Sequence, residues 1–511
     1  KPNLTLNYGL RYEYYGVLHE SKNRAVLFQA LTGQLLSPDS QWYDSSTRNF
    51  GPRVALSWSP RRFSDKTVFR IGAGYYYGPG QTEDQLQPAE SDRISTNITS
   101  GPLLVYPLDV ATVRSTYDVN NPNLQFQPRA YAPGYHIPER ILQYTASVQQ
   151  QLPGNAVLTV AYVGSQGRNL FLRSITNKIV SVDTDPKTGA AIINREFGNR
   201  FAEIDYKTSG GTSHYNALQT SLNRRFSRGL TLAAQYNWSH DIGNSGGSNE
   251  ARTAANNYDF GADYGNNTFD VRHTFNLSAL YELPYGKGRR YGSQIGSLAD
   301  AVLGGWQVGG LVNARSGLPV EVLITRPDVV YRDNRNGTYV SSPIVGADGT
   351  VYTTAVINVP GGGNSRNVRR PDVVPGVNPY LNNDRSLINP AAFAIPAPGT
   401  FGNLGRDALH GPNLAQLDFT LAKRFRLTEK GSLEFRAEFY NLLNHTNFAA
   451  PAGGQPRLTD ALGIGSGKIQ PGQPFSASTA GGNFGVATST VSNQIGQGTN
   501  RQIQFALRLS F

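Results

Sequence analysis

Ser245 lies in a stretch whose spacing matches the nucleophile motif of serine hydrolases. The stretch Gly243-Asn244-Ser245-Gly246-Gly247 fits the pattern G-x-S-x-G. In those enzymes a sharp turn between a strand and a helix exposes the serine hydroxyl as a nucleophile. The residues around this match are rich in Gly, Ser and Asn, which is typical of a loop. We therefore interpret the match as chance and predict that the chain is not an enzyme.

Two further stretches partly match phosphate and calcium loops. The stretch from Gly463 to Lys468 is one residue short of a phosphate loop, and Ile469 stands where that loop needs a Ser or Thr for Mg²⁺. Asp183 and Asp185 resemble the start of a calcium loop, but a Lys occupies its fifth position and its Gly is displaced. We interpret the aspartates as part of a hairpin tip.

Metal and thiol chemistry have no support in the sequence. The 7 histidines are scattered without an H-x-x-x-H pair, and Cys is absent. We therefore expect no metal and no cofactor. Glu434, Arg436 and Glu438 lie on one face of a candidate strand, where they either bind a substrate or form a ladder of ion pairs with neighbouring strands. Of these two interpretations we favour the ladder.

The elements that must position these residues are strands in which apolar and polar side chains alternate. Such alternation is the mark of a strand with two different faces. In the first segment Leu4, Leu6, Tyr8 and Leu10 share one face, and Thr5 begins the other. Twelve candidate strands run over 4–14, 54–58, 69–77, 142–148, 158–162, 218–222, 230–238, 271–283, 306–312, 417–421, 433–439 and 503–511.

The apolar faces of these segments are almost free of charge, whereas the opposite faces carry residues such as Arg11, Arg70 and Glu282. A charge that faces lipid at the middle of a bilayer costs about 2–4 kcal/mol, so a membrane barrel must keep that face uncharged. Lys423 is the clearest exception, and it lies near a strand end, where a long side chain can reach the interface. Aromatic residues near segment ends, such as Trp306, are typical of an interfacial girdle.

The lengths of the connections separate a membrane barrel from a soluble sandwich or propeller, in which strands also alternate. Long connections lie at about 16–52, 78–140, 165–214, 240–269, 317–413 and 445–500, and short ones at 60–66, 153–155, 227–229, 284–304 and 426–432. Outer-membrane barrels have long extracellular loops and short periplasmic turns. The sequence therefore predicts an all-β fold, a transmembrane antiparallel up-and-down β-barrel with long extracellular loops. We expect 78–140 and 317–413 to be outside the cell, and 153–155 and 227–229 in the periplasm.

Composition agrees with export to a bacterial envelope. The mean hydropathy of the 511 residues is −0.39, and no window approaches the ~18 consecutive apolar residues of a membrane helix. A chain without Cys is suited to an oxidising compartment. The net charge of +11 reflects either Arg spread over loops and lumen or attraction of anionic ligands or lipid. Without a basic run, we expect no nucleic-acid partner.

Several stretches resemble TonB-dependent receptors, specifically the Oar-like branch with an N-terminal carboxypeptidase-regulatory-like domain. The resemblance covers essentially the whole chain. It is carried by Gly305-Trp306-Gln307-Val308-Gly309-Gly310, by the segment from Asn389-Pro390 to Gly402-Asn403, by Glu434-Phe435-Arg436-Ala437-Glu438-Phe439-Tyr440-Asn441, and by Ala161-Tyr162-Val163-Gly164-Ser165.

The resemblance implies a receptor or transporter in the bacterial outer membrane that takes up a ligand we cannot name from the sequence. Family members form a barrel of about 22 strands around a plug that contacts the TonB system. We find about half of those strands and no plug, so residues 1–511 are expected to be the C-terminal barrel portion. The expected partners are outer-membrane lipid, lipopolysaccharide, the barrel assembly machinery and, through the plug, TonB. Two alternatives are a structural or interaction barrel without transport and a secreted soluble β-protein that binds through its loops.

The last segment also resembles the C-terminal signal by which outer-membrane barrels engage their assembly machinery. Phe505, Leu507, Leu509 and the terminal Phe511 alternate along it. The alternative is an amphipathic strand that happens to end in Phe. The first segment, 4–14, has no protective charge or bulge on its apolar face, so we expect it to be an open edge or to pair with something other than 503–511.

Overall fold

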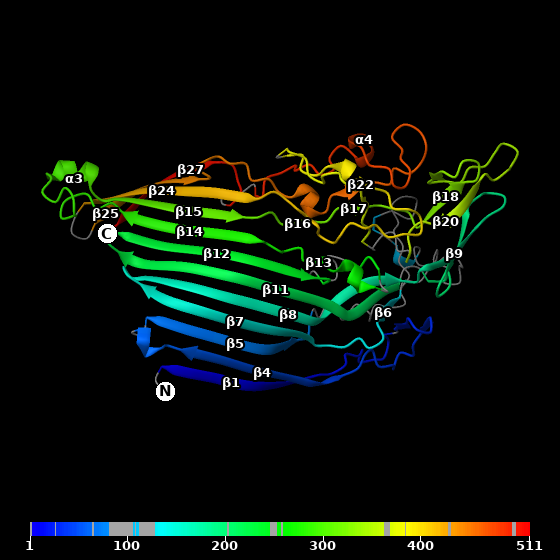
Figure 1. Ribbon diagram of the computed structural model, residues 1–511, viewed down its shortest axis with the longest axis horizontal. Helices are drawn as coiled ribbons and strands as arrows, with labels where there is room; N and C mark the ends of the chain where they lie inside the picture. The colour runs from blue at the N-terminus through cyan, green and yellow to red at the C-terminus, as the bar shows by residue number, and fades with distance from the viewer. Residues whose placement is uncertain are drawn as a thin grey trace.

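A computed structural model shows one large curved sheet with folded connections at one end (Figure 1). The structure describes residues 3–25, 27–63, 66–80, 106–107, 109–111, 128–201, 204–245, 253–256, 259–361, 368–383, 385–427, 431–492 and 497–511. Twelve strands of the sheet follow one another in the order β1-β4-β5-β7-β8-β11-β12-β14-β15-β24-β25-β27, and two short strands, β6 and β13, pair at its rim.

All twelve predicted strands are present, in chain order and each next to its predecessor. Neighbours pair antiparallel throughout, as the up-and-down prediction requires. The twelve strands are β1 (Leu4–Tyr15), β4 (Ser46–Trp58), β5 (Thr67–Gly78), β7 (Glu139–Leu152), β8 (Ala156–Thr176), β11 (Ile204–Ser227), β12 (Leu230–Gly243), β14 (His273–Glu282), β15 (Trp306–Arg315), β24 (Leu414–Arg426), β25 (Ser432–Tyr440) and β27 (Gln502–Ser510).

The register of the sheet keeps the apolar residues on one face. Leu6 pairs with Leu56, and Leu56 pairs with Ile71 on the next strand. Because side chains alternate with a period of two, each such pair determines which residues of the strand lie on which face of the sheet. Leu6 and Ile71 remain largely exposed, as expected for side chains that meet lipid rather than protein.

Long and short connections alternate strictly along the sheet. The short ones span 59–66, 153–155, 228–229, 283–305 and 427–431, and the long ones span 16–45, 79–138, 177–203, 244–272, 316–413 and 441–501. The short turns lie at the end of the sheet that also carries both chain termini, and the long connections lie at the other end (Figure 1). At the tightest turns Gly154 and Gly229 have positive φ angles of 75° and 82°, which glycine adopts without strain.

Within the residues that the structure describes, short strands and helices form in the connections between the twelve strands. The strands are β2 (Phe28–Gln29), β3 (Gln34–Leu35), β6 (Arg129–Tyr131), β9 (Ile179–Thr184), β10 (Ala191–Arg195), β13 (Gly265–Asn266), β16 (Pro319–Val320), β17 (Leu323–Ile324), β18 (Val329–Asp333), β19 (Tyr339–Val340), β20 (Thr353–Ile357), β21 (Asp372–Val373), β22 (Phe393–Ala394), β23 (Leu409–His410) and β26 (Arg457–Leu458). The helices are η1 (Arg61–Phe63), η3 (Phe260–Asp263), α3 (Ser297–Leu303), η4 (Pro390–Ala392), η5 (Pro451–Gly454) and α4 (Ala477–Ala480).

Strands β8 and β11 also extend further than predicted, so the connection expected at 165–214 shrinks to 177–203. Their pairing passes through register shifts between Thr208 and Ser213. Beyond the shifts, the alternation of apolar and polar residues that reveals a membrane strand is lost. A strand that has left the lipid no longer needs an uncharged outer face, which explains why the sequence pattern ended early.

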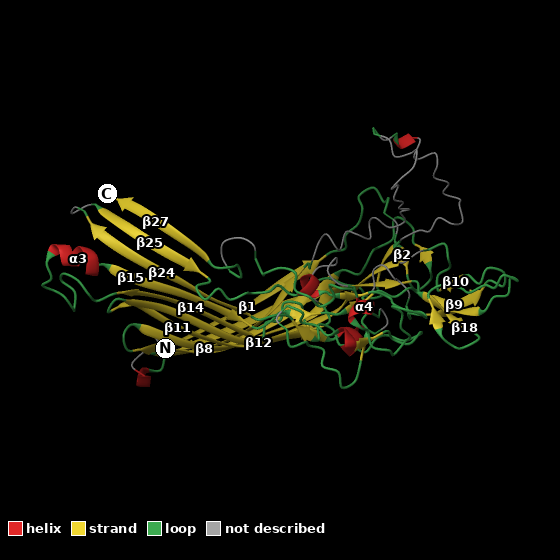
Figure 2. Cartoon of the chain, turned by 90° about the horizontal axis from the view of Figure 1, so that it is seen from above, coloured by secondary structure: helices red, strands yellow, loops and turns green. Residues whose placement is uncertain are grey.

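The main hydrophobic core lies in the folded connections and not within the sheet. The connection between β15 and β24 contributes Val320, Ile388 and Phe393, and the connection between β25 and β27 contributes Leu458 and Phe475. Strands β17 and β26, one from each connection, pair in parallel beside this core. These two connections therefore fold into one unit, which we call the cap, at the end of the sheet opposite α3 (Figure 2).

The strand order begins at β1 and ends at β27, and within the part of the chain that the structure describes no ladder joins these two strands. Pairing on one side only agrees with the open edge expected for 4–14. None of the helices in the described ranges is long and apolar enough to cross a membrane.

Candidate functional site

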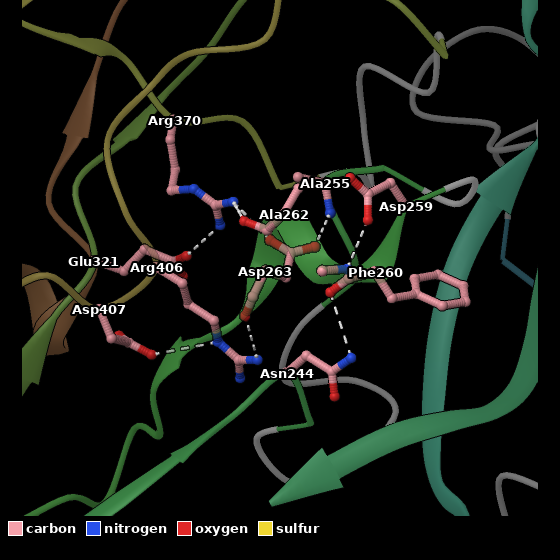
Figure 3. A network of polar contacts seen from close by, with 11 residues as sticks. Asn244, Ala255, Asp259, Phe260, Ala262, Asp263, Glu321, Arg370, Arg406 and Asp407 are labelled. Carbon is pink, nitrogen blue, oxygen red and sulfur yellow. Dashed lines mark hydrogen bonds and ion pairs between the residues drawn. The ribbon is translucent and has the colours of Figure 1, made fainter.

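A buried network of charged side chains lies where the cap meets the connection between β12 and β14 (Figure 3). Arg370 is its centre, with Nη2 at 2.7 Å from Oδ1 of Asp263 and Nη1 at 3.2 Å from Oε1 of Glu321. Asp263 also accepts a 2.7 Å hydrogen bond from the amide of Ala255. Arg406 lies beside this group, with Nε at 3.7 Å from Oδ2 of Asp407.

Charge balance explains why these groups tolerate burial. Burial alone would lower the pKa of Arg370, but the carboxylates of Asp263 and Glu321 outweigh it and raise that pKa. The guanidinium therefore stays charged, and it holds segments that are far apart in the sequence. Removing one partner of a buried ion pair strongly destabilises the folded protein, because the remaining charge is buried without compensation.

Arg326 is a second buried cation, and it is held by a ring of oxygens. Its guanidinium donates to the carbonyls of Thr400 at 3.0 Å and Pro396 at 3.0 Å, and to Oδ1 of Asn358 at 2.9 Å. Burial, aided by the nearby Arg369, lowers the pKa of Arg326 to about 10. Arg326 therefore remains charged at neutral pH.

Arg326, Arg369 and Arg370 line a cavity of about 230 Å³. All charged residues in the cavity lining are these arginines; backbone and small side chains around Gly402 and Gly405 form much of the rest. The terminal nitrogens of Arg370 already contact carboxylates, and those of Arg326 contact carbonyls. We therefore interpret this cavity as part of the scaffold of the cap.

A larger hollow, of about 770 Å³, lies on the sheet face that carries the polar residues. Arg53 and Tyr76 both line it, and the guanidinium carbon of Arg53 lies 4.3 Å from the ring centroid of Tyr76. Gly74, which pairs with Arg53, leaves room for its stem, because a Cβ at Gly74 would come within 2.9 Å of Arg53 Cγ. Small residues on this face, such as Gly9 and Gly72, leave the space open.

The three motifs that pointed to chemistry are structural. The Ser245 hydroxyl donates a 2.8 Å hydrogen bond to the carbonyl of Phe171, which occupies its proton, while Gly246 and Gly247 lie outside the described residues. Asp185 accepts hydrogen bonds from the amides of Lys187 and Thr188 at the tip of the β9–β10 hairpin, so the hairpin interpretation is confirmed.

The segment from Gly463 to Lys468 forms a turn, closed by a bond from the Gly463 amide to the Ile469 carbonyl, with no helix to complete a phosphate loop in that segment. Across the ranges that the structure describes, no three acidic or histidine side chains come together to hold a metal.

Glu434, Arg436 and Glu438 form the ion-pair ladder that the sequence favoured. Arg436 lies 2.7 Å from Glu434 and 3.7 Å from Glu438, and Arg424 on the neighbouring strand lies 3.7 Å from Glu434. Register also places Arg508 of β27 opposite Glu434. The charges therefore hold one another on the polar face of three adjacent strands.

Lys423, the charged exception on the apolar face, is buried near the end of β24, with 4% of the residue exposed. Its Nζ donates to the carbonyl of Gly304 and lies 5.0 Å from the ring centroid of Trp306. The turn between β14 and β15 thus supplies the oxygen that water would supply at the interface.

The predicted assembly-signal residues lie on or next to β27. Phe505, Leu507 and Leu509 are exposed on one face of the strand, and Phe511, just beyond it, is 99% exposed. Phe505 also stacks on Phe435 of β25, with ring centroids 6.2 Å apart. This geometry leaves the row of side chains open to contact, and their role in assembly stays a prediction.

Sequence reasoning missed the buried network around Arg370. One signal was present: Glu321 lies within an apolar run, between Val320 and Val322, and all three are buried. A single carboxylate in such a run needs a buried cation as partner. The identity of that partner, 49 residues away in the chain, depends on the fold of the cap and could not be read from local pattern.

The comparison with protein families agrees with this architecture. The family described as outer membrane beta barrel domain matches residues 1–504. Similar solved structures include the outer membrane transporter YddB from Escherichia coli, with a TM-score of 0.39, 9% identity, and coverage of 91% of this chain and 41% of that chain. The FrpB iron transporter from Neisseria meningitidis (F5-1 variant) gives a TM-score of 0.40 and 11% identity, with coverage of 99% and 43%. No curated protein sequence matches the chain.

The chain spans less than half the length of these solved structures. The family match covers nearly all of the sheet and the cap, and it agrees with an apolar outward face, strict antiparallel neighbours and alternating connections. The protein is located in the bacterial outer membrane and is not an enzyme. The chain belongs to the outer membrane β-barrel family.

Proposed function

We propose that this chain is the C-terminal barrel portion of a TonB-dependent receptor of the Oar-like branch, which takes up a ligand through the outer membrane. The observation that supports this proposal is the position of the 770 Å³ hollow on the polar face of the twelve-stranded sheet, which we also call the barrel wall. The cap lies at one end of the same sheet. A cap with its own core can present a fixed binding surface, and a polar wall can line a passage.

The proposal includes a plug and further strands supplied by residues that precede 1–511 in the whole protein. One side of β1 pairs with no described strand, and this supports the proposal, since an apolar strand edge of this length is normally paired or protected. The plug would contact TonB in the periplasm, and this contact would drive uptake.

The decisive experiment is capture of the whole protein by the purified periplasmic domain of TonB from the same organism. We expect the whole protein to be retained and a version truncated to residues 1–511 to pass through. Failure of the whole protein to bind would contradict active transport.

A structural or interaction barrel is the second candidate, and one contact favours it. The β9–β10 hairpin is bound to the β18–β20 sheet, with the Ala355 amide donating to Oγ1 of Thr184 at 2.8 Å. The β9–β10 hairpin lies beside β18 and β20 of the cap, at the end of the molecule far from α3 (Figure 1), where a partner at the cell surface would meet it. Binding to whole cells that depends on this hairpin, without TonB capture, would support this candidate.

A further inference from the structure

The turn between β14 and β15 carries an apolar surface that no described part of the chain covers. Helix α3 has the sequence Ser-Leu-Ala-Asp-Ala-Val-Leu, and Leu298 is 88% exposed, Val302 65% and Leu303 48%. Exposure of three large aliphatic side chains on one short helix is unfavourable in water, because each leaves apolar area hydrated.

The single charged residue of α3 is directed towards the turn and not outward. The Asp300 carboxylate accepts a 2.6 Å hydrogen bond from the amide of Lys287, earlier in the same turn. A Cβ on Gly286 or Gly304 would come within 3 Å of that carboxylate, so the turn closes tightly around it. With Asp300 used in this way, the exposed side chains of α3 other than Ser297 are apolar.

Helix α3 is attached on the outward side of the sheet. The indole Nε1 of Trp306 donates a 2.8 Å hydrogen bond to the carbonyl of Val302 at the end of the helix. Trp306 shares the face of Val308, which pairs with Tyr281 on the lipid-facing side of β14. The exposed surface of α3 is therefore continuous with the apolar face of the wall. Trp and Tyr residues are enriched at the level where lipid meets water.

Positive charge accompanies this apolar surface. Lys287, Arg289 and Arg290 are exposed in the same turn, and Asp300 is the only acidic residue between 283 and 305. Arg289 pairs with Glu282 at 3.2 Å, whereas Lys287 and Arg290 lie at the surface. An apolar helix beside basic residues is the pattern of elements that lie in the plane of a membrane interface and favour anionic lipid.

We propose that the turn around α3 inserts Leu298, Val302 and Leu303 into the phospholipid leaflet at the short-turn end of the barrel, with Lys287 and Arg290 on anionic headgroups. The occupant of this surface is the lipid next to β14 and β15, and not a protein. The turn then anchors this end of the wall at a fixed depth in the membrane.

The test measures the depth of a fluorophore on α3. Ala301→Cys in the whole protein is labelled with an environment-sensitive dye, and the protein is reconstituted in vesicles of phosphatidylcholine and phosphatidylglycerol with brominated acyl chains. Because such helices lie about 5–10 Å into the boundary between headgroups and acyl chains, we expect about a twofold loss of emission. A dye at Arg62→Cys, in the turn between β4 and β5, is the control and should lose little.

Two variants of the labelled protein separate the apolar and the charged contributions. Leu298→Asn with Val302→Asn should restore most of the emission, whereas Leu427→Asn, in the turn between β24 and β25, should leave the quenching unchanged. Lys287→Gln with Arg290→Gln should weaken quenching in vesicles that contain phosphatidylglycerol and not in pure phosphatidylcholine. Heat-modifiable migration on a gel checks that each variant is a folded barrel.

Equal emission from the dyes at positions 301 and 62 in brominated vesicles would overturn the proposal. So would protection from aqueous iodide in native membranes without quenching by bromolipid, since a protein would then cover the surface. Quenching that survives the double Asn substitution would also contradict it.

Discussion

The ring of Tyr144 on β7 covers Gly164 on β8 so closely that a Cβ at Gly164 would come within 2.1 Å of it. The Tyr144 hydroxyl donates a hydrogen bond to Oδ1 of Asn216 on β11. The same oxygen also accepts a hydrogen bond from the Tyr162 hydroxyl. Two tyrosines thus donate to one side-chain amide oxygen on the face that meets lipid. In a membrane, a polar group without such partners would be costly.

Gly164→Ala should therefore destabilise the barrel, because the added methyl displaces the ring and breaks its bond to Asn216. We expect about 1–3 kcal/mol, the usual cost of overpacking. Urea unfolding in vesicles measures it. Gly9→Ala on β1 is the control, since a Cβ there meets nothing within 4 Å; equal losses for both would contradict this account of Gly164.

Leu277→Arg should be much worse than Asn276→Arg. Leu277 shares the outward face with Ala234 and Val312, whereas Asn276 points to the polar face beside Gln235 and Asn313. Only the first substitution places a charge in hydrocarbon, at a cost of about 2–4 kcal/mol. An outer-membrane folding assay compares them, and equal tolerance would mean that the two faces are assigned the wrong way round.

Arg370→Met should loosen the cap. It removes the cation that contacts the buried carboxylates of Asp263 and Glu321, at a cost of about 3–5 kcal/mol. Limited proteolysis of folded protein should then cut within the cap while the wall stays intact. Arg335→Met, which removes a pair with Asp333 through a half-exposed arginine, should destabilise the cap far less. Similar cleavage of both variants would argue against the network as the main support.

Phe511→Ala should impair assembly more than stability. The side chain of Phe511 is fully exposed, so its removal from the folded protein should change the free energy of unfolding little. If the terminal strand is an assembly signal, protein should accumulate in the periplasm in cell fractions. Normal amounts of Phe511→Ala in the outer membrane would rule out the signal and leave only an amphipathic last strand.

Single cysteines report the orientation of the barrel, since residues 1–511 contain none to interfere. Asn336→Cys, exposed at the tip between β18 and β19, should react with an impermeant reagent on intact cells. Arg62→Cys, in a short turn at the opposite end, should react only after the outer membrane is opened. The reverse pattern of labelling would invert the topology.

The twelve strands could be predicted because lipid imposes a rule on every second residue. Charge is excluded from Leu6 and Ile71 by the same energetics wherever the strand lies, so the pattern is local and visible. No such rule acts on the cap. Val320 and Leu458 are buried together only because two connections fold on one another. The sequence of either connection alone does not predict this contact.

Lys423 and the ends of β8 show the same division. Lys423 breaks the facial rule locally, and its compensation by the carbonyl of Gly304 lies 119 residues away in the chain. Strand β8 continues to Thr176 after the alternation stops, because backbone pairing with β11 sustains it without help from lipid. The sequence pattern thus predicts the strands whose outer faces meet lipid. It does not predict features that depend on contacts between distant parts of the chain.

The shared core of the cap has a consequence for how surface variants of this protein can arise. Its buried side chains come from both the β15–β24 and the β25–β27 connections, and β17 pairs with β26 across them. If one connection were replaced by that of a relative, its core side chains would pack against a second connection with which they had not evolved. Recombination that preserves folding must therefore exchange the two connections together, so that these two segments are inherited as one block although β24 and β25 separate them in the gene.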